Sequence, residues 1–588
     1  MNLSAICHIS GSNYAYAYNK NELHIRLRTA KDDMDSVDIF YGNKYDWINK
    51  VSFPMKKILS DELFDYYEYR IVGDDSRLGY YFGLTKDYKT LYYTEAGYVD
   101  EFNDDKSYCY FFQYPYINEI DVHRTPDWVR DTNFYQIFVE RFCNGNPSNS
   151  PKNVSPWGTE PTPVTFMGGD LIGIIKKLDY LEELGIKGIY LTPIFESVSN
   201  HKYDTTDYMK IDKYFGNEEA LRLLIEECHK RNIKIVLDAV FNHCGKGFAP
   251  FQDVIKNGKK SEYFDWFYIA GEEVEFEPIN FQAFGFVPYM PKMNTSNQRV
   301  KKYLYDVISY WTKEFDIDGW RLDVSDELDH EFWRGFRKLV KGINPQAVII
   351  GENWHNSYPW LMGDQFDSVM NYSLTKLCLD YFATNEINAR TFMYEISSLL
   401  IRYSKQVNES MLNLLDSHDT ERFLTTAKGE VKYLKNAAAF LYAYVGMPCT
   451  YYGTEIGMDG VYDPGCRKAF DWNEDNWNKE LYSFYRRLIK LRNEEAALKY
   501  GEVEFIYNDD VFAMKRSYED DCIYVVINNT DEAKTVDTGI KDEELYDILN
   551  EEDIKNNLGM IKVLPKTAHY IKKKEGMRSE EVKNEKIS

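Results

Sequence analysis

Residues 217–240 read NEEALRLLIEECHKRNIKIVLDAV, a helix followed closely by a buried strand. Asn217 is a favourable helix N-cap, and an apolar stripe at helical spacing follows it. The stripe consists of Ala220, Leu221, Leu224, Ile225 and Cys228. Residues 233–240 are almost continuously apolar, which is typical of a strand covered on both faces. The stretch therefore predicts parallel strands that are connected by crossover helices.

The same plan recurs along the middle of the chain. Residues 171–184 carry Leu and Ile at helical spacing, Gly185 ends that helix, and a buried strand follows at 186–191. Strand candidates occur in series at 134–139, 186–191, 233–240, 317–323, 347–352, 366–371, 411–415 and 449–452. Eight such strands favour a closed (β/α)8 TIM barrel, an α/β fold.

The ends of the chain have a different texture. Residues 1–123 contain short alternating runs between Asp, Asn and Gly clusters, which predicts an N-terminal β-sandwich. The barrel then spans 124–501, and an irregular, aromatic-rich stretch at 244–297 is expected to form an inserted lobe over its mouth. Residues 502–571 predict a small C-terminal β-sandwich, and 572–588 a polar, disordered tail.

Composition excludes several functional classes. The net charge of -24 argues against binding of nucleic acid or anionic membranes, while the aromatic fraction of 16% suits stacking on sugars. The longest apolar run, 437–449, is too short for a bilayer span, and the N-terminus lacks a secretory signal pattern. The nine cysteines are scattered singly, which predicts reduced thiols. We expect a cytoplasmic protein.

Charged residues gather where the predicted strands end. Active sites of TIM barrels lie at the C-terminal ends of the strands, so these residues are expected to meet at one mouth. They are Asp238 and His243 at the end of the third strand, Arg321 and Asp323 on the fourth, Glu352 on the fifth, and His418 and Asp419 after the seventh.

Three of these carboxylates suit the hydrolysis of a glycosidic bond, which needs a nucleophile and a proton donor. They are Asp323, Glu352 and Asp419. Arg321, on the same face of its strand as Asp323, would keep that Asp ionised, and crowding by like charge would raise the pKa of Glu352. The competing interpretation is a set of unrelated carboxylates that cap helices or bind a metal.

Several short motifs resemble those of the α-amylase family, glycoside hydrolase family 13. DAVFNH at 238–243, GWRLD at 319–323, GEN at 351–353 and SHD at 417–419 are similar to its four conserved regions. MPKMN at 290–294 resembles the MPKLN signature of the branch of cyclomaltodextrinases, maltogenic amylases and neopullulanases, with Met in place of Leu. The resemblance implies the same domain order along almost the whole chain.

The resemblance also implies roles for individual residues. Asp323 corresponds to the nucleophile, Glu352 to the general acid/base and Asp419 to the transition-state stabiliser. Residues that match sugar-binding positions are His201, Tyr203, Asp238, His243, Arg321, Glu327, Trp354, His418, Asp463 and Arg467. Among them, Tyr203 would stack under the sugar on the non-reducing side of the cleaved bond.

The remaining candidates are aromatic and acidic residues. Trp354 resembles an aromatic contact on the leaving-group side, and Glu327 resembles a residue linked to transfer onto sugar acceptors; packing and a surface charge are the alternatives. Phe281, Phe284 and Phe286 are candidates for a glucan platform, with packing within the lobe as the alternative.

One loop is a candidate calcium site, although the chemistry itself requires no cofactor. Its oxygen donors are Asn144, Asn146, Asn149, Ser150, Gly168 and Asp170. Asn and Ser stand at two positions where the family often has Asp, which would weaken the site. An Asn-rich turn without an ion is the alternative.

We therefore expect a retaining hydrolase of α-1,4-glucosidic bonds in cyclodextrins, maltooligosaccharides, pullulan and starch, acting through a glycosyl-Asp323 intermediate. A 4-α-glucanotransferase that uses the same site, and a non-catalytic carbohydrate-binding protein, are the alternatives. The resemblance implies a homodimer formed through the N-terminal domain. Candidates for that interface or for a glycan contact are Tyr41, Tyr45 and Trp47, or Tyr66, Tyr67 and Tyr69.

Overall fold

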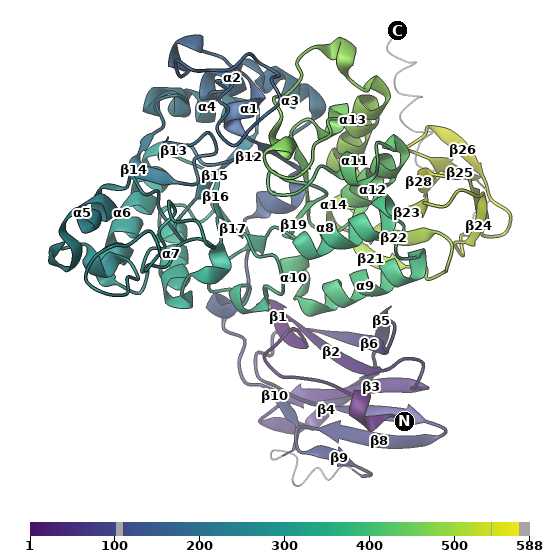
Figure 1. Ribbon diagram of the computed structural model, residues 1–588. Helices are drawn as coiled ribbons and strands as arrows, with labels where there is room; N and C mark the ends of the chain where they lie inside the picture. The colour runs from purple at the N-terminus through teal and green to yellow at the C-terminus, as the bar shows by residue number, and fades with distance from the viewer. Residues whose placement is uncertain (102–109, 542–543, 575–588) are drawn as a thin grey trace.

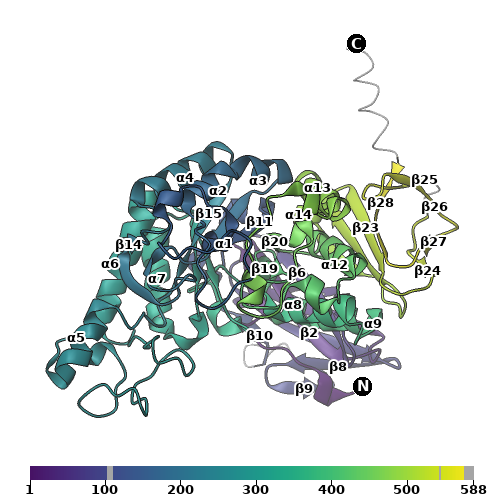
Figure 2. The ribbon, with the colours of Figure 1, turned by 45° about the horizontal axis from the view of Figure 1, so that its top comes forward.

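The computed structural model describes residues 1–101, 110–541 and 544–574. A central barrel carries one β-sandwich, formed by the N-terminal part of the chain, beneath it and another, formed by the C-terminal part, at its side (Figure 1). Helices surround the barrel strands, as the tilted view shows (Figure 2).

The N-terminal sandwich has two antiparallel sheets, of four strands in the order β1-β2-β6-β5 and of six strands in which β4-β3-β7-β8-β9 are joined by β10 on β7. Its inner faces bury aliphatic and aromatic side chains such as Ile25, Leu27, Ile39 and Phe82. The strands are β1 Ala15–Asn19, β2 Glu22–Ala30, β3 Ser36–Asn43, β4 Asp46–Pro54, β5 Lys56–Ser60, β6 Phe64–Val72, β7 Leu78–Lys86, β8 Lys89–Thr94, β9 Gly97–Val99 and β10 Phe112–Tyr114.

The barrel is an 8-stranded parallel sheet in the order β18-β17-β16-β15-β12-β11-β20-β19. A parallel bridge between Met370 and Leu412 joins its two edges, and this closes the predicted barrel. Its strands are β11 Phe134–Ile137, β12 Gly188–Leu191, β15 Lys234–Ala239, β16 Gly319–Leu322, β17 Val348–Gly351, β18 Ser368–Val369, β19 Leu412–Leu414 and β20 Met447–Tyr451. Each lies within its predicted range except β20, which starts two residues earlier.

The helices follow the predicted apolar stripes. Asn217 caps α4 by accepting from the Ala220 backbone N–H at 3.0 Å. The single helix expected over 171–184 is divided into two helices, α2 and α3, which meet at Lys177. The barrel helices are α1 Val139–Phe142, α2 Leu171–Lys176, α3 Leu178–Leu184, α4 Glu218–Lys230, α6 Gln298–Phe315, α7 His330–Ile343, α8 Tyr372–Cys378, α9 Ala389–Arg402, α10 Lys405–Asn408, α11 Phe423–Thr426, α12 Val431–Ala443, α13 Lys479–Glu494 and α14 Ala496–Tyr500.

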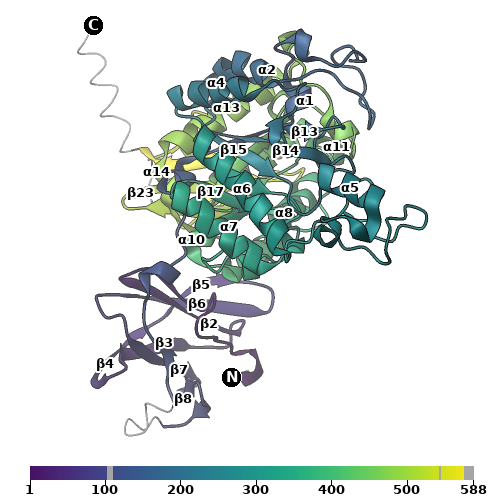
Figure 3. The same cartoon turned by 90° about the vertical axis from the view of Figure 1, so that its left-hand side faces the viewer.

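Two segments extend from the barrel between strands and helices. The expected lobe contains α5 (Ala249–Asn257) and projects to one side of the barrel (Figure 3). A hairpin of β13 (Phe195–Ser197) and β14 (Thr205–Ile211) follows β12, and its turn carries His201 and Tyr203. The sequence did not predict this hairpin, because β13 has only three residues and the buried positions of β14 do not alternate.

The C-terminal sandwich has a 6-stranded and a 2-stranded sheet, in the orders β21-β22-β23-β28-β25-β26 and β24-β27. Its last strand includes Lys572 and Lys573, which were predicted to belong to the tail; ion pairs of Lys572 with Glu495 and Asp521 hold that strand end. The rest of the predicted tail, from 575, lies outside the described residues. The strands are β21 Glu502–Phe505, β22 Phe512–Tyr518, β23 Asp521–Asn528, β24 Lys534–Asp537, β25 Glu544–Asp547, β26 Glu552–Lys555, β27 Met560–Val563 and β28 Thr567–Lys573.

Among the described residues, no helix is both long and apolar enough to cross a bilayer. The apolar run at 437–449 is the end of α12 and the start of β20, as predicted. The eight cysteines in the described segments are free thiols.

Candidate active site

Three carboxylates from neighbouring strands converge on one buried guanidinium. Nη1 of Arg321 donates to Oδ1 and Oδ2 of Asp238, at 3.0 and 2.9 Å, and to Oδ1 of Asp323 at 3.0 Å. Nη2 lies 2.8 Å from Oε2 of Glu352. All four side chains are almost completely buried. One cation therefore joins the strand ends that the sequence predicted to meet.

Strand geometry explains this convergence. The period of two in β16 places Arg321 and Asp323 on the same face, and the parallel register with β15 sets Asp238 opposite Arg321. Val324 then turns the chain with φ at +44°, a strained value for a β-branched residue. Its backbone N–H donates to Glu352 Oε2 at 2.9 Å, so the turn after β16 also fixes the carboxylate after β17.

Burial dominates the electrostatics of this cluster. It raises the pKa of Asp238 to about 6 and also raises the pKa of Asp323 and of Glu352, with Arg321 opposing in each case. The negative charge of Asp419 also raises the pKa of Glu352, as the sequence predicted, but its effect is smaller than that of burial. The expectation that Arg321 keeps Asp323 ionised was too simple, because one guanidinium faces three buried carboxylates. Burial therefore shifts all three carboxyl groups toward their protonated forms, and the charge of Arg321 opposes that shift.

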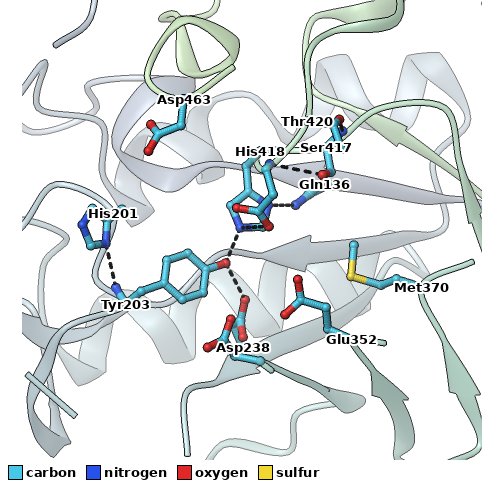
Figure 4. A network of polar contacts seen from close by, with 12 residues as sticks. Gln136, His201, Tyr203, Asp238, Glu352, Met370, Ser417, His418, Thr420 and Asp463 are labelled. Atoms are coloured by element: carbon cyan, nitrogen blue, oxygen red, sulfur yellow. Dashed lines mark hydrogen bonds and ion pairs between the residues drawn. The ribbon is translucent and has the colours of Figure 1, made fainter. Parts of the chain in front are cut away.

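The rings of Tyr203 and His418 lie side by side next to the carboxylates (Figure 4). Their rings are nearly parallel at 8°, with centroids 5.4 Å apart, and Tyr203 Oη lies 2.5 Å from His418 Nε2. The same hydroxyl donates to Asp238 Oδ2 at 3.0 Å. Gln136 donates to His418 Nδ1 at 2.7 Å, and burial lowers the pKa of His418 well below its ordinary value. A neutral imidazole therefore meets the tyrosine.

His201 supports Tyr203 from the other side. Its Nδ1 accepts from the Tyr203 backbone N–H at 3.1 Å, and the two rings are stacked at 6.0 Å. Burial lowers the pKa of His201 to about 4. This histidine thus fixes the backbone of the tyrosine through an acceptor nitrogen.

The carboxylate of Asp419 contacts an arginine and a histidine. Its Oδ1 lies 3.1 Å from Arg467 Nη2, and its Oδ2 lies 3.1 Å from His418 Nε2. Arg467 also pairs with Asp463 at 3.0 Å and donates from Nε to the His418 carbonyl at 2.8 Å. The predicted pair of Asp463 and Arg467 is therefore connected to the carboxylates through Asp419 and His418.

Trp354 lies against Glu352 on the other side of the cluster. Its Nε1 donates to Glu352 Oε1 at 3.2 Å, and its ring lies flat on Tyr372, with centroids 3.8 Å apart and planes at 3°. Nearly half of Trp354, 48%, is exposed. Glu327 instead pairs with Lys292 of the lobe at 3.1 Å. An open aromatic surface thus adjoins the proposed acid.

His243 and the lobe phenylalanines differ in their surroundings. Phe284 stacks on the buried ring of His243, with centroids 5.0 Å apart, and burial lowers the pKa of that histidine to about 3. Phe281 packs against Phe251 inside the lobe, whereas Phe286 is 98% exposed. The three phenylalanines therefore do not form one continuous platform.

Three site residues were not identified from the sequence. Tyr190 donates to Asp238 Oδ2 at 2.7 Å, Gln136 binds His418, and Tyr372 supports Trp354. Gln136 carries a usable signal, since it is a polar residue inside the otherwise apolar strand β11. Nothing in the local sequence distinguishes the two tyrosines from ordinary core residues.

The candidate calcium loop gathers as expected, but its oxygen atoms are largely engaged. Asp170 caps α2, accepting from the backbone N–H groups of Gly145, Asn146 and Gly173 at 2.6 to 3.1 Å. Asn146 Oδ1 accepts from Ser148, and Asn149 Oδ1 accepts from Asn146. Asn144 Oδ1 is buried without a hydrogen-bond partner in the described structure. In the described structure the loop thus retains the free amide oxygen of Asn144, while both oxygens of Asp170 already accept backbone N–H groups, which leaves ligands for a weak cation site only.

This arrangement can break a bond at an acetal carbon. Asp323 and Glu352 are bound to the same guanidinium, so two carboxyl groups meet at the barrel mouth, as glycoside hydrolysis by a nucleophile and a proton donor requires. The buried Glu352 can hold a proton for the leaving oxygen. The neighbouring aromatic rings Tyr203 and Trp354 are suited to contact sugar faces.

Comparisons with known proteins agree with this chemistry. The family model "Alpha amylase, catalytic domain" matches residues 136–476, and "Alpha amylase, N-terminal ig-like domain" matches residues 1–118. A cyclomaltodextrinase of Thermoanaerobacter pseudethanolicus is 48% identical, covering 97% of this chain and 99% of the relative. An intracellular maltogenic amylase of Bacillus subtilis is 45% identical over 87% and 88%. Neopullulanase 2 of Thermoactinomyces vulgaris is 42% identical over 96% and 98%.

Solved structures give the same result. A structure of a cyclomaltodextrinase superposes with a TM-score of 0.93 at 42% identity, covering 97% of this chain and 100% of that chain. The match therefore includes both sandwiches as well as the barrel. The chain belongs to the α-amylase family of glycoside hydrolases.

Proposed function

We propose that this enzyme opens cyclodextrins and cleaves α-1,4 bonds in maltooligosaccharides and pullulan, with retention of configuration. The observation that carries the proposal is the buried Arg321 that binds both Asp323 and Glu352. The names of its relatives, cyclomaltodextrinase, maltogenic amylase and neopullulanase, support this substrate class.

In the first step, an Asp323 oxygen attacks the anomeric carbon. The bond from that carbon to the leaving oxygen breaks, and Glu352 gives its proton to that oxygen. A glycosyl ester on Asp323 and a shortened or opened glucan result. Burial raises the pKa of Glu352, which favours the protonated form that this step needs.

In the second step, the ionised Glu352 takes a proton from water, whose oxygen attacks the same carbon. The ester bond breaks, and its electron pair returns to Asp323. A sugar hydroxyl in place of water gives transfer, so the same site supports both outcomes. Asp419 would stabilise the positive charge that develops on the sugar in each step.

Chromatograms of products from β-cyclodextrin, pullulan and soluble starch under matched conditions test this proposal. We expect faster turnover of β-cyclodextrin and pullulan than of starch. A wide preference for starch would contradict the substrate class while leaving the chemistry of the carboxylates intact.

We further propose a homodimer formed through the N-terminal sandwich. Tyr45 and Ile48, at the β3–β4 turn and on β4, are 78% and 90% exposed, and Val51 and Phe53 of the same strand are also exposed. Tyr66, in contrast, is buried against Asp61, and Trp47 stacks on Phe111, so these two are packing residues.

Sedimentation velocity at micromolar concentration tests the dimer. We expect Ile48→Asp to shift the enzyme to monomer, and Leu558→Asp, at an equally exposed position in the C-terminal sandwich, to leave it unchanged. A wild-type monomer would refute the proposal.

We also place the protein in the cytoplasm, supported by its free thiols and by the intracellular maltogenic amylase among its relatives. Detection of the protein mainly in the culture medium of its native host would contradict this location.

We propose a weak structural calcium site at Asn144 and Asp170, because the free amide oxygen and a single carboxylate provide few charged ligands. Thermal denaturation in calcium and in EDTA tests it. We expect calcium to raise the Tm of the wild type and to raise that of Asn144→Ala less; equal Tm values in both buffers would exclude the site.

A further inference from the structure

An ion pair outside the cluster of carboxylates links the turns after β16 and β17. Asp326 lies in the 3-10 turn Ser325–Glu327, shortly after Asp323. His355 follows Glu352 by three residues. Its Nε2 lies 2.9 Å from Asp326 Oδ2. The pair therefore joins the two segments that carry the nucleophile and the acid.

Buried contacts already fix the acid without this pair. Glu352 accepts from the Val324 backbone N–H through Oε2. Ser325 Oγ donates to the Glu352 carbonyl at 3.1 Å and to Asn353 Oδ1 at 2.7 Å. The ion pair is the outermost of these connections, with side chains 22% and 62% exposed for Asp326 and His355. The ion pair should therefore affect the residues between Glu352 and the protein surface rather than Glu352 itself.

Trp354 is the residue between the inner contacts and the ion pair. One ring face lies on Tyr372, while nearly half of the side chain is open. On its C-terminal side, His355 is held by Asp326 and by the ring of Trp360, with centroids 6.4 Å apart. Fixing His355 thus fixes the backbone that carries the open indole.

The other acidic residue of the turn does not compete for His355. Glu327 is paired with Lys292 of the lobe at 3.1 Å. The ring of Trp360 also contacts the imidazole of His330, whose Nδ1 is bonded to Gln365 at 2.8 Å. Asp326 is therefore the carboxylate that faces His355.

We propose that Asp326 and His355 are positioning residues for the leaving-group side of the cleft. They hold Trp354 in the orientation in which its open surface contacts the sugar that departs in the first step or arrives as acceptor in the second. This inference rests on the proposed glycosyl-transfer chemistry at Asp323.

A substrate without a sugar leaving group separates this role from the chemistry. With α-maltosyl fluoride, Asp323 forms a bond to the anomeric carbon, the carbon–fluorine bond breaks, and fluoride departs with the electron pair. Water then cleaves the ester. No sugar occupies the leaving-group side in either step, whereas maltotetraose places one there.

The test compares both substrates, with the fluoride kept too dilute to act as an acceptor. We expect Asp326→Asn and His355→Ala to keep wild-type turnover of the fluoride. Their kcat/KM for maltotetraose, and transfer to added maltose, should fall roughly two- to fivefold, the range for a partly exposed ion pair. His355→Gln, whose amide can donate to Asp326, should recover part of the loss.

Asp364→Asn is the matched control. Its carboxylate pairs with Arg334 at 2.5 Å and also joins α7 to the segment after β17, and the described structure gives it no contact with Trp354. We expect this variant to match the wild type on both substrates. Equal losses on both substrates in the Asp326 and His355 variants, or no loss on either, would overturn the inference. A wild type inactive on both would overturn the proposed function, and this inference with it.

Discussion

Nη1 of Arg321 lies 3.0 Å from Oδ1 of Asp323, so the strand that carries the proposed nucleophile also supplies its counter-ion. The two residues are on one face of β16 because its side chains alternate. The same guanidinium also binds Asp238 and Glu352, so a single group contacts all three carboxylates of the cluster.

Replacing Arg321 should therefore disable the enzyme even with conservative chemistry. Arg321→Lys keeps the charge but cannot bind three carboxylates in a planar fork, and we expect kcat to fall by roughly 100-fold or more. Arg321→Met leaves buried carboxylates without a cation and should cost about 3–5 kcal/mol of stability. Steady-state kinetics and thermal denaturation measure both. Near-normal turnover by the Lys variant would show that charge alone is sufficient.

Tyr203 combines a ring contact with a hydroxyl that bonds Asp238 and His418. Tyr203→Phe keeps the ring and should lower kcat/KM on maltotriose by roughly tenfold, since one buried hydrogen-bonding group is lost. Tyr203→Ala also removes the stacking surface and should lose considerably more. Indistinguishable kinetics of the two variants would mean that the ring contributes nothing.

The pH profile should show two limbs. Asp323 must be ionised and Glu352 protonated, so kcat/KM should fall as the pH drops through the pKa of Asp323 and as it rises through the pKa of Glu352. Burial raises both pKa values, which moves the profile above the ordinary carboxyl range of about 4. The upper limb should disappear for Glu352→Gln acting on α-maltosyl fluoride, which needs no acid. An optimum near pH 4 would contradict this assignment.

Stability should also depend on pH through Asp238. Its pKa is raised to about 6 in the folded protein, while an unfolded Asp titrates near 3.9, so the folded state binds more protons between these values. This contribution is complete below about pH 4 and is lost as the pH rises through 6. Asp238→Asn should therefore give a Tm that falls less between pH 4 and 6 than that of the wild type. Parallel Tm curves would exclude Asp238 as a source.

The sequence was sufficient to predict the barrel because apolar runs such as 233–240 and helix caps such as Asn217 are local signals. It also located Asp323 and Glu352 at strand ends. It could not give the hairpin that carries Tyr203, because one strand of that hairpin has only three residues and the other shows no regular alternation of buried and exposed residues. It also could not give the supporting residues Tyr190 and Tyr372. The sequence also could not predict that the pKa of Asp323 is raised, because burial is a property of the folded chain.

Isolation of the covalent intermediate tests the central claim most directly. Glu352→Gln should form the maltosyl ester rapidly from α-maltosyl fluoride and hydrolyse it slowly, because no base activates water. Mass spectrometry of a rapidly quenched and digested sample should then find one maltosyl group on Asp323. The same group on another residue, or steady release of maltose with no protein adduct and with inverted configuration, would contradict a retaining mechanism through Asp323.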